Sequence, residues 1–122
     1  MAFGIDSAGQ VVGSSQAANN GPQHAFLYGG GLMMDLGTLG GTDSQADGIN
    51  SRGLTAGWSR TASGERHAFL WSSGRMMDLN SLVTLEPGVS LEEATAVNDM
   101  GQIVANASNG RAYLIALPVR LQ

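Results

Sequence analysis

The stretch AFGIDSAGQVVG, residues 2–13, decides the fold because the chain repeats it twice. It returns as ADGINSRGLTAG at residues 46–57 and as ATAVNDMGQIVA at residues 94–105, at offsets of 44 and 48 residues. Every copy has an Asp or Asn three residues before a Gly, and that spacing suits a tight turn ending in a left-handed residue. We therefore expect each copy to form a β-hairpin in which its first four residues pair with its last four.

Two further elements repeat in the same order along the chain. HAFLY at residues 24–28 returns as HAFLW at residues 67–71 and, in weaker form, as RAYLI at residues 111–115. MMDLGTL at residues 33–39 returns as MMDLNSL at residues 76–82. Each full repeat thus predicts four short antiparallel strands.

The HAFLY segment alternates strictly between two faces. His24, Phe26 and Tyr28 fall on one face of the predicted strand, and Ala25 and Leu27 fall on the other. Both faces carry apolar side chains, so we expect the sheet to be covered on both sides. The Gly-containing segments after the HAFLY and HAFLW strands, GGGL and SSGR, supply the positive φ angles that hairpin turns need.

Four antiparallel strands in about 40 to 45 residues match a β-propeller blade. The expected fold class is therefore all-β, with tandem four-stranded antiparallel repeats that resemble propeller blades and are completed by oligomerisation. A single domain would hold repeat one at residues 1–45, repeat two at 46–93 and a partial repeat three at 94–122. A β-solenoid or a sandwich of duplicated hairpins is the alternative. The longer stretch at 83–93 predicts a loop or one helical turn before Ala94.

Small residues recur at every second position in the first strand of each copy. Small side chains permit close approach of neighbouring strands, as near a crowded axis. The positions are Ala2 and Gly4, Ala46 and Gly48, and Ala94 and Ala96.

Composition narrows the classes of function. The 122 residues suffice for one modest core, and 18 Gly with only 13% charged residues indicate a turn-rich chain that folds. All six basic residues are Arg and the net charge is −4, so we expect neither nucleic acid nor a membrane surface as a partner. The absence of Cys excludes disulfides and thiolate metal sites, and we expect no cofactor.

The motifs GIDSAGQVVGSS, HAFLY, MMDLGTLGG, GINSRG, HAFLW and MMDLN resemble the HAF repeat, which is named after its His-Ala-Phe tripeptide. That repeat occurs in bacterial proteins described as probable extracellular repeat proteins, and the resemblance covers nearly the whole chain. It implies a blade-like β repeat in often exported proteins, with no established catalytic activity and no active site to carry over. Arg111 and Tyr113 depart from the pattern, and the N-terminal residues lack the layout of a signal peptide.

His24 and His67 are the only histidines, and they occupy the same repeat position. We interpret both as structural residues, each hydrogen-bonded to a neighbouring strand or turn, because no close pair of metal ligands accompanies them. Asp35 and Asp78 also recur, and we expect them to cap strand ends by accepting backbone amides. The alternative is a small hydrolase or lyase that uses a His-Asp pair for acid-base chemistry. Duplication of both residues argues against a unique catalytic site.

Other candidate motifs have weaker support. Asp43 and Asp47 lie in GGTDSQADG, which lacks the spacing of a calcium loop and is interpreted as a solvated turn. The glycines at 29–31 lack the residues that follow in a phosphate-binding loop. None of the serines at 14, 15, 59, 72 and 73 stands in a nucleophile motif. No catalytic or metal-binding residue is therefore expected.

A non-catalytic binding or scaffold module is the favoured hypothesis, with a glycan or a small molecule as the possible ligand. Trp58 is the best ligand candidate because the other copies have no aromatic residue there, whereas Trp71 continues the Phe69 face and is expected in the core. The variable loops at 16–23 and 60–66 would supply the remaining contacts. The candidate ligand-binding residues are Trp58, Tyr28, Asn20, Arg60 and Glu65.

Two repeats and a partial third cannot close a propeller, which needs four to eight blades. The first and last residues are mostly apolar, whereas repeat proteins usually protect their ends with polar caps. We therefore expect a homo-oligomer, most simply a two-fold dimer with about six blade equivalents. A fragment of a longer repeat array or a monomeric β fold is the alternative.

Overall fold

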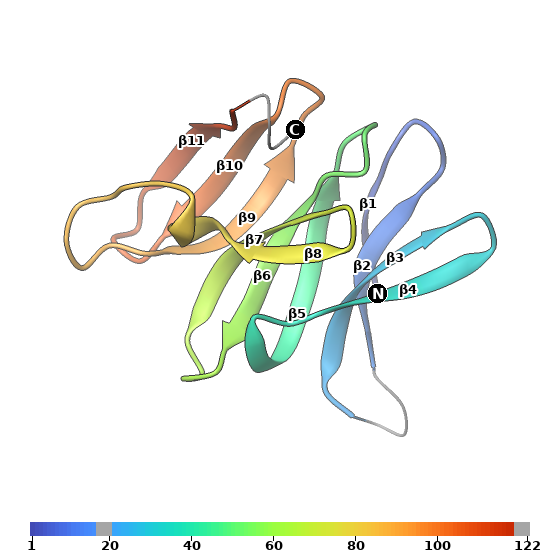
Figure 1. Ribbon diagram of the computed structural model, residues 1–122, viewed down its shortest axis with the longest axis horizontal. Helices are drawn as coiled ribbons and strands as arrows, with labels where there is room; N and C mark the ends of the chain where they lie inside the picture. Colours follow the sequence, from blue (N-terminus) through green and yellow to red (C-terminus); the bar gives the residue numbers. More distant parts are fainter. Residues whose placement is uncertain (17–20, 119–122) are drawn as a thin grey trace.

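The computed structural model describes residues 1–16 and 21–118, which form three antiparallel sheets and contain no α-helix (Figure 1). The first sheet has the strand order β1 (Ala2–Ile5), β2 (Val11–Gln16), β3 (Gln23–Gly29), β4 (Leu32–Gly37). The second sheet runs β5 (Gly40–Ile49), β6 (Thr55–Thr61), β7 (Arg66–Ser72), β8 (Arg75–Asp78). The third sheet contains β9 (Leu91–Val97), β10 (Gln102–Ala107) and β11 (Ala112–Ala116). The sheets in this part of the chain do not close into a ring.

The three predicted hairpins are present and share one turn chemistry. In the second copy the Asn50 side-chain oxygen accepts the amides of Arg52 and Leu54, at 2.9 and 3.0 Å. The amide of Gly53 donates to the Asn50 carbonyl, and its φ of +82° lies in the left-handed region where glycine is favoured. Asp6 and Asn98 arrange their turns in the same way. The structure therefore contains the tight turn that the Asx-Gly spacing predicted in each copy.

Two apolar cores lie between the sheets, so the second sheet is the middle layer (Figure 1). Strand β7 faces both cores: Phe69 and Trp71 belong to the contact with the first sheet, and Ala68 and Leu70 to the contact with the third. This alternation confirms the predicted facing and the core position of Trp71. The contact between the first and second sheets buries Val12, Ala25, Leu27, Leu36, Ala46, Ile49, Phe69 and Trp71. Covering on both sides, as expected for all copies, is correct only for the middle sheet.

Hydroxyl groups of the second sheet bind the first sheet and the segment that joins the two sheets. The Ser44 hydroxyl accepts the Ala25 amide at 2.8 Å and donates to the Gly37 carbonyl at 2.5 Å. The Ser59 hydroxyl accepts the Leu39 amide at 2.8 Å. Buried backbone groups between the sheets thereby obtain partners.

The first strands of the three sheets approach closely, as their small residues predicted. A Cβ atom on Gly4 would lie 3.0 Å from the Asp47 carbonyl oxygen, and one on Gly48 would lie 3.2 Å from the Cα atom of Ala96. Larger side chains at these positions would push neighbouring sheets apart.

Strand β5 begins at Gly40, so the solvated turn expected around Asp43 and Asp47 is wrong. The segment pairs with β6 from Gly40 opposite Thr61 to Ile49 opposite Thr55. This pairing extends β5 toward the N-terminus, beyond the hairpin predicted to begin at residue 46. The sheet consequently starts before the repeat boundary at residue 46.

The segment at 83–93 splits between a loop and the start of β9 at Leu91. The helical turn lies earlier, as the 3₁₀ turn η1 (Leu79–Ser81), where the Asp78 side chain accepts the Asn80 amide. Within the described residues, no helix is long and apolar enough to span a membrane.

Candidate functional site

The outer face of the first sheet, which points away from the second sheet, leaves several large apolar side chains in solvent. Ile5 is 67% exposed, Tyr28 43% and Met33 58%. Tyr28 pairs with Val11 on β2 and with Met33 on β4, so the apolar surface crosses the sheet. Exposed apolar side chains grouped on one face are typical of interaction and ligand-binding surfaces, so this face is the candidate site.

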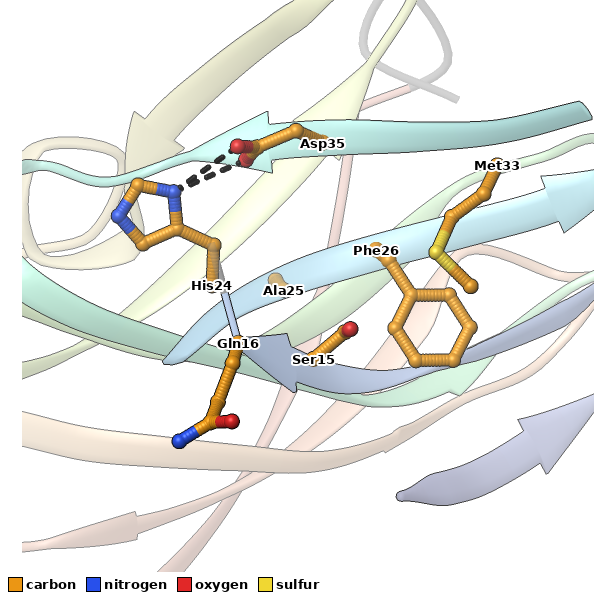
Figure 2. A pocket seen from close by; sticks show the side chains of 7 residues that line it. All are labelled: Ser15, Gln16, His24, Ala25, Phe26, Met33 and Asp35. Carbon is orange, nitrogen blue, oxygen red and sulfur yellow. Dashed lines mark hydrogen bonds and ion pairs between the residues drawn. The ribbon is translucent and has the colours of Figure 1, made fainter. Parts of the chain in front are cut away.

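A cavity of about 190 Å³ opens on this face (Figure 2). Ser15 on β2, His24 and Phe26 on β3, and Met33 and Asp35 on β4 contribute to its lining. Strand register explains the grouping, because Ser15 lies opposite His24, and Phe26 lies opposite Asp35. The cavity thus combines an apolar floor with a His-Asp pair at its edge.

The His24 imidazole forms a hydrogen bond from Nδ1 to the Asp35 carboxylate, at 3.0 and 3.1 Å to its two oxygens. The same carboxylate accepts the Gly37 amide at 2.8 Å. Both residues thus make the contacts expected from sequence: the imidazole bonds to a neighbouring strand, and the carboxylate caps a strand end.

The second sheet repeats this pair. His67 Nδ1 lies 2.7 Å from Asp78 Oδ2, and Asp78 Oδ1 accepts the Asn80 amide at 2.9 Å. Ser59 lies opposite His67, so it is the counterpart of Ser15.

The two sheets differ in what covers the Ser-His-Asp trio, which is Ser15, His24 and Asp35 in the first sheet and Ser59, His67 and Asp78 in the second. In the second sheet, the Leu39 side chain packs against the core that contains Phe69, and its amide donates to Ser59 Oγ. In the first sheet, the corresponding position over Phe26 and Ser15 is the open cavity. The open cavity on the first sheet therefore corresponds to a position on the second sheet that Leu39 of the same chain occupies.

No protein-family model, curated protein or solved structure matches the chain. The resemblance to the HAF repeat therefore depends on the motifs alone, and the site is interpreted from its own geometry. Among the residues that the structure describes, no group of three or more His, Cys, Asp or Glu side chains could hold a metal ion.

Of the ligand-binding residues predicted from sequence, three lie on one hairpin of the second sheet. The Arg66 guanidinium stacks over the Trp58 ring at 4.3 Å from its centroid, and Arg60 lies at 5.9 Å. Arg60 also donates to the Gly64 carbonyl, and Glu65 is exposed beside His67. Tyr28 lies apart from these three, on the outer face of the first sheet, and Asn20 falls outside the described residues.

The sequence did not reveal a half-buried acidic pair, Asp47 and Glu93, between the second and third sheets. Burial, together with the adjacent Glu93 carboxylate, raises the pKa of Asp47 from 3.8 to about 7. Gln45 donates to Asp47 Oδ1 at 2.8 Å, and Arg66 pairs with Glu93 at 2.8 Å. Asp47 Oδ2 is buried and accepts no hydrogen bond within the described residues, so a proton shared with Glu93 satisfies it best.

One signal could have located this pair. The hairpin predicted for residues 46–57 already placed Asp47 on a strand between two small residues. That position is inconsistent with a solvated turn, and it puts the carboxyl group at the sheet contact.

The tips of the three hairpins also converge, around a cavity of about 270 Å³. The Ser51 amide donates to the Asp99 carboxylate at 2.7 Å, and this hydrogen bond lowers the pKa of Asp99 below 3.8. The Asn50 side chain donates to the Asn98 carbonyl at 3.0 Å. These bonds join the second and third sheets, so the polar groups here act in sheet-to-sheet contact.

Proposed function

We propose that this chain is a non-catalytic binding or scaffold module built from HAF-like β repeats, whose three sheets act as propeller-like blades. One observation carries the proposal: the outer face of the first sheet has the side chains of a sheet-to-sheet contact, but none of the sheets in residues 1–16 and 21–118 packs against it. Phe26, Tyr28 and Met33 stand where Phe69, Trp71 and Met76 stand in the second sheet, and those three are packed at the contact with the first sheet. Association through this face is the function that the surface supports best.

The second candidate is a hydrolase or lyase that uses the His24-Asp35 pair. A carboxylate bonded to imidazole Nδ1, with a serine in the same cavity, has the composition of a catalytic triad. In Figure 2, however, the Ser15 hydroxyl points toward the Phe26 ring and the His24 imidazole turns to Asp35.

The second sheet gives the trio another role. There, the Ser59 hydroxyl accepts the Leu39 amide and donates to the Arg60 carbonyl at 3.0 Å, so it serves packing. Because these residues serve packing in the second sheet, their presence in the first sheet does not require a catalytic role. The binding module is therefore favoured over the enzyme.

Three assays on the wild-type chain and on His24→Ala, Tyr28→Ala and Trp58→Ala test the proposal. Chromogenic esters, phosphates and glycosides should give no turnover that depends on His24. A fluorescent apolar dye should bind the wild-type chain and lose most of its signal in Tyr28→Ala. A glycan and metabolite thermal-shift screen then asks whether Trp58 binds a ligand, which would show as a saturable shift lost in Trp58→Ala. Turnover that disappears in a folded His24→Ala chain would replace the binding module with the enzyme.

A further inference from the structure

We infer that a second copy of this chain docks head to tail, with the outer face of its third sheet on the outer face of the first sheet, in the register of the internal sheet-to-sheet contact. The inference rests on the proposed role of the first sheet's outer face as an association surface. It adds the identity of the partner and the surface that the partner uses.

The exposed face of the third sheet carries the first half of that contact. In the first sheet, Val12, Ala25 and Leu27 pack against the second sheet. The repeat offsets place Val104, Ala112 and Leu114 at the same positions of the third sheet. Here Val104 is 40% exposed and Leu114 is 66% exposed, because no further sheet of the described part of the chain covers them. The third sheet thus repeats the face with which the first sheet binds its neighbour.

The outer face of the first sheet carries the second half. In the second sheet, Ile49, Phe69 and Trp71 pack against the first sheet. One repeat earlier, the corresponding side chains are Ile5, Phe26 and Tyr28 on the outer face. Each counterpart is again apolar and similar in size, so the two open faces are complementary halves of the contact that already joins the first and second sheets.

The cavity on the first sheet concerns only the receiving half of the contact. Its counterpart in the second sheet holds Leu39, whose amide donates to Ser59. Ser15 offers the same hydroxyl in the open cavity. The outer face of the first sheet is therefore built as the receiving half of a contact with another repeat.

Size complementarity favours the head-to-tail arrangement over the two-fold dimer expected from sequence. In the internal contact, the large Phe69 and Trp71 side chains face a surface with the small Ala25. A two-fold axis through the outer face of the first sheet would instead set Phe26 and Tyr28 against copies of themselves. Head-to-tail contacts are heterologous and produce a ring where the rotation closes, or an open array where it does not.

Two exposed substitutions separate the arrangements. Leu114→Glu places a carboxylate on the third-sheet face, and Tyr28→Glu places one on the first-sheet face; both positions lie in solvent in one chain, so the fold should survive. A lone carboxylate buried in an apolar contact should weaken association by more than about a hundredfold. Ala8→Glu, on an exposed turn, is the matched control for added charge.

The measurement is sedimentation velocity over a concentration series, with circular dichroism to confirm folding. The wild-type chain and Ala8→Glu should form species heavier than the 12.6 kDa monomer, and each face variant alone should stay monomeric. An equimolar mixture of Leu114→Glu and Tyr28→Glu should form a dimer and stop there, because only one pair of intact faces is available.

Three results would overturn the inference: a wild-type chain that stays monomeric, a mixture that stays monomeric, or a single face variant that associates as the wild type does. The last result, in Leu114→Glu, would indicate the two-fold dimer through the first sheet. A monomeric wild type whose dye or ligand binding still depends on Tyr28 would remove the second copy as partner but leave the binding module standing. Turnover dependent on His24 would remove the binding module itself.

Discussion

Phe69→Ala should remove a large part of the stability of this chain. The Phe69 side chain is fully buried in the core between the first and second sheets, in the same core as Trp71 and on the same strand β7 of the middle sheet. Truncating a buried Phe to Ala typically costs about 3 to 5 kcal/mol, because the transfer energy is lost and a cavity remains. Small domains have a free energy of unfolding of about 5 to 15 kcal/mol, so the variant should be close to unfolding.

Urea denaturation followed by tryptophan fluorescence measures this loss. Trp71 is buried in the same core as Phe69 and reports on the contact between the first two sheets, whereas Trp58 lies on another part of the second sheet. Phe26→Ala is the matched control, because Phe26 holds the same position one repeat earlier. Its side chain is only 7% exposed, but it lines the open cavity and none of the described sheets packs above it. Its cost should be smaller, about 1 to 3 kcal/mol, at concentrations where the chain is monomeric.

Two results would refute the reasoning. A loss below about 1 kcal/mol for Phe69→Ala would mean that the side chain is not part of a packed core. A larger loss for Phe26→Ala than for Phe69→Ala in the monomer would mean that the first sheet, and not the second, is the middle layer.

Three further predictions concern the backbone and the half-buried carboxyl group of Asp47. Gly9→Val should destabilise by about 1 to 3 kcal/mol more than Ala8→Val in chemical denaturation, because Gly9 has a φ of +83° and a branched side chain is strained there; equal losses would contradict the turn geometry. Gly57→Ala should cost at least about 2 kcal/mol, since its Cβ atom would collide with the carbonyl oxygen of Gln45, and a melting temperature equal to wild type would disprove that contact. The pKa of Asp47 is about 7 in the folded chain against 3.8 ordinarily, so its contribution to stability is full below about pH 4 and is lost as the pH rises through 7. Asp47→Asn, which stays neutral, should therefore lose less stability than wild type between pH 5 and pH 8, and identical pH profiles in urea titrations would exclude the raised pKa.

The local parts of the fold could be predicted from sequence because their causes are local. Asp6, Asn50 and Asn98 each accept amides within their own turn, so their spacing from a glycine is sufficient to identify the hairpin. Side-chain alternation along β3 and β7 is likewise a property of any extended strand.

The start of β5 depends on pairing with a neighbouring strand, and the local residues alone predicted a turn there. Gly40, Gly41 and Asp43 are typical of turns. Yet a Cβ atom on Gly41 would lie 2.5 Å from the Thr61 carbonyl oxygen, so this glycine is required by close pairing with the neighbouring strand. Knowledge of the partner strand was needed to identify the segment as part of the sheet.

The candidate site could be predicted only in part. Recurrence of His24 and Asp35 was enough to suggest a structural hydrogen bond, which the structure contains. Ser15 and the cavity could not be found in this way, because the repeat shows which positions are equivalent but does not show which copy lacks a neighbour. The missing information is the order in which the sheets stack.

The hydroxyl groups between the first two sheets have a consequence for geometry. Apolar surfaces in contact can slide over one another with little change in buried area, whereas the Ser44 hydroxyl of the second sheet accepts the Ala25 amide of the first at a fixed place. The Ser59 hydroxyl in turn accepts the amide of Leu39, in the segment that joins the two sheets. These bonds set the position of one sheet relative to the next, and with it the rotation between sheets. In any assembly that continues this stacking, that rotation determines the curvature, so two small polar side chains contribute to whether the structure closes into a ring or grows as an open array.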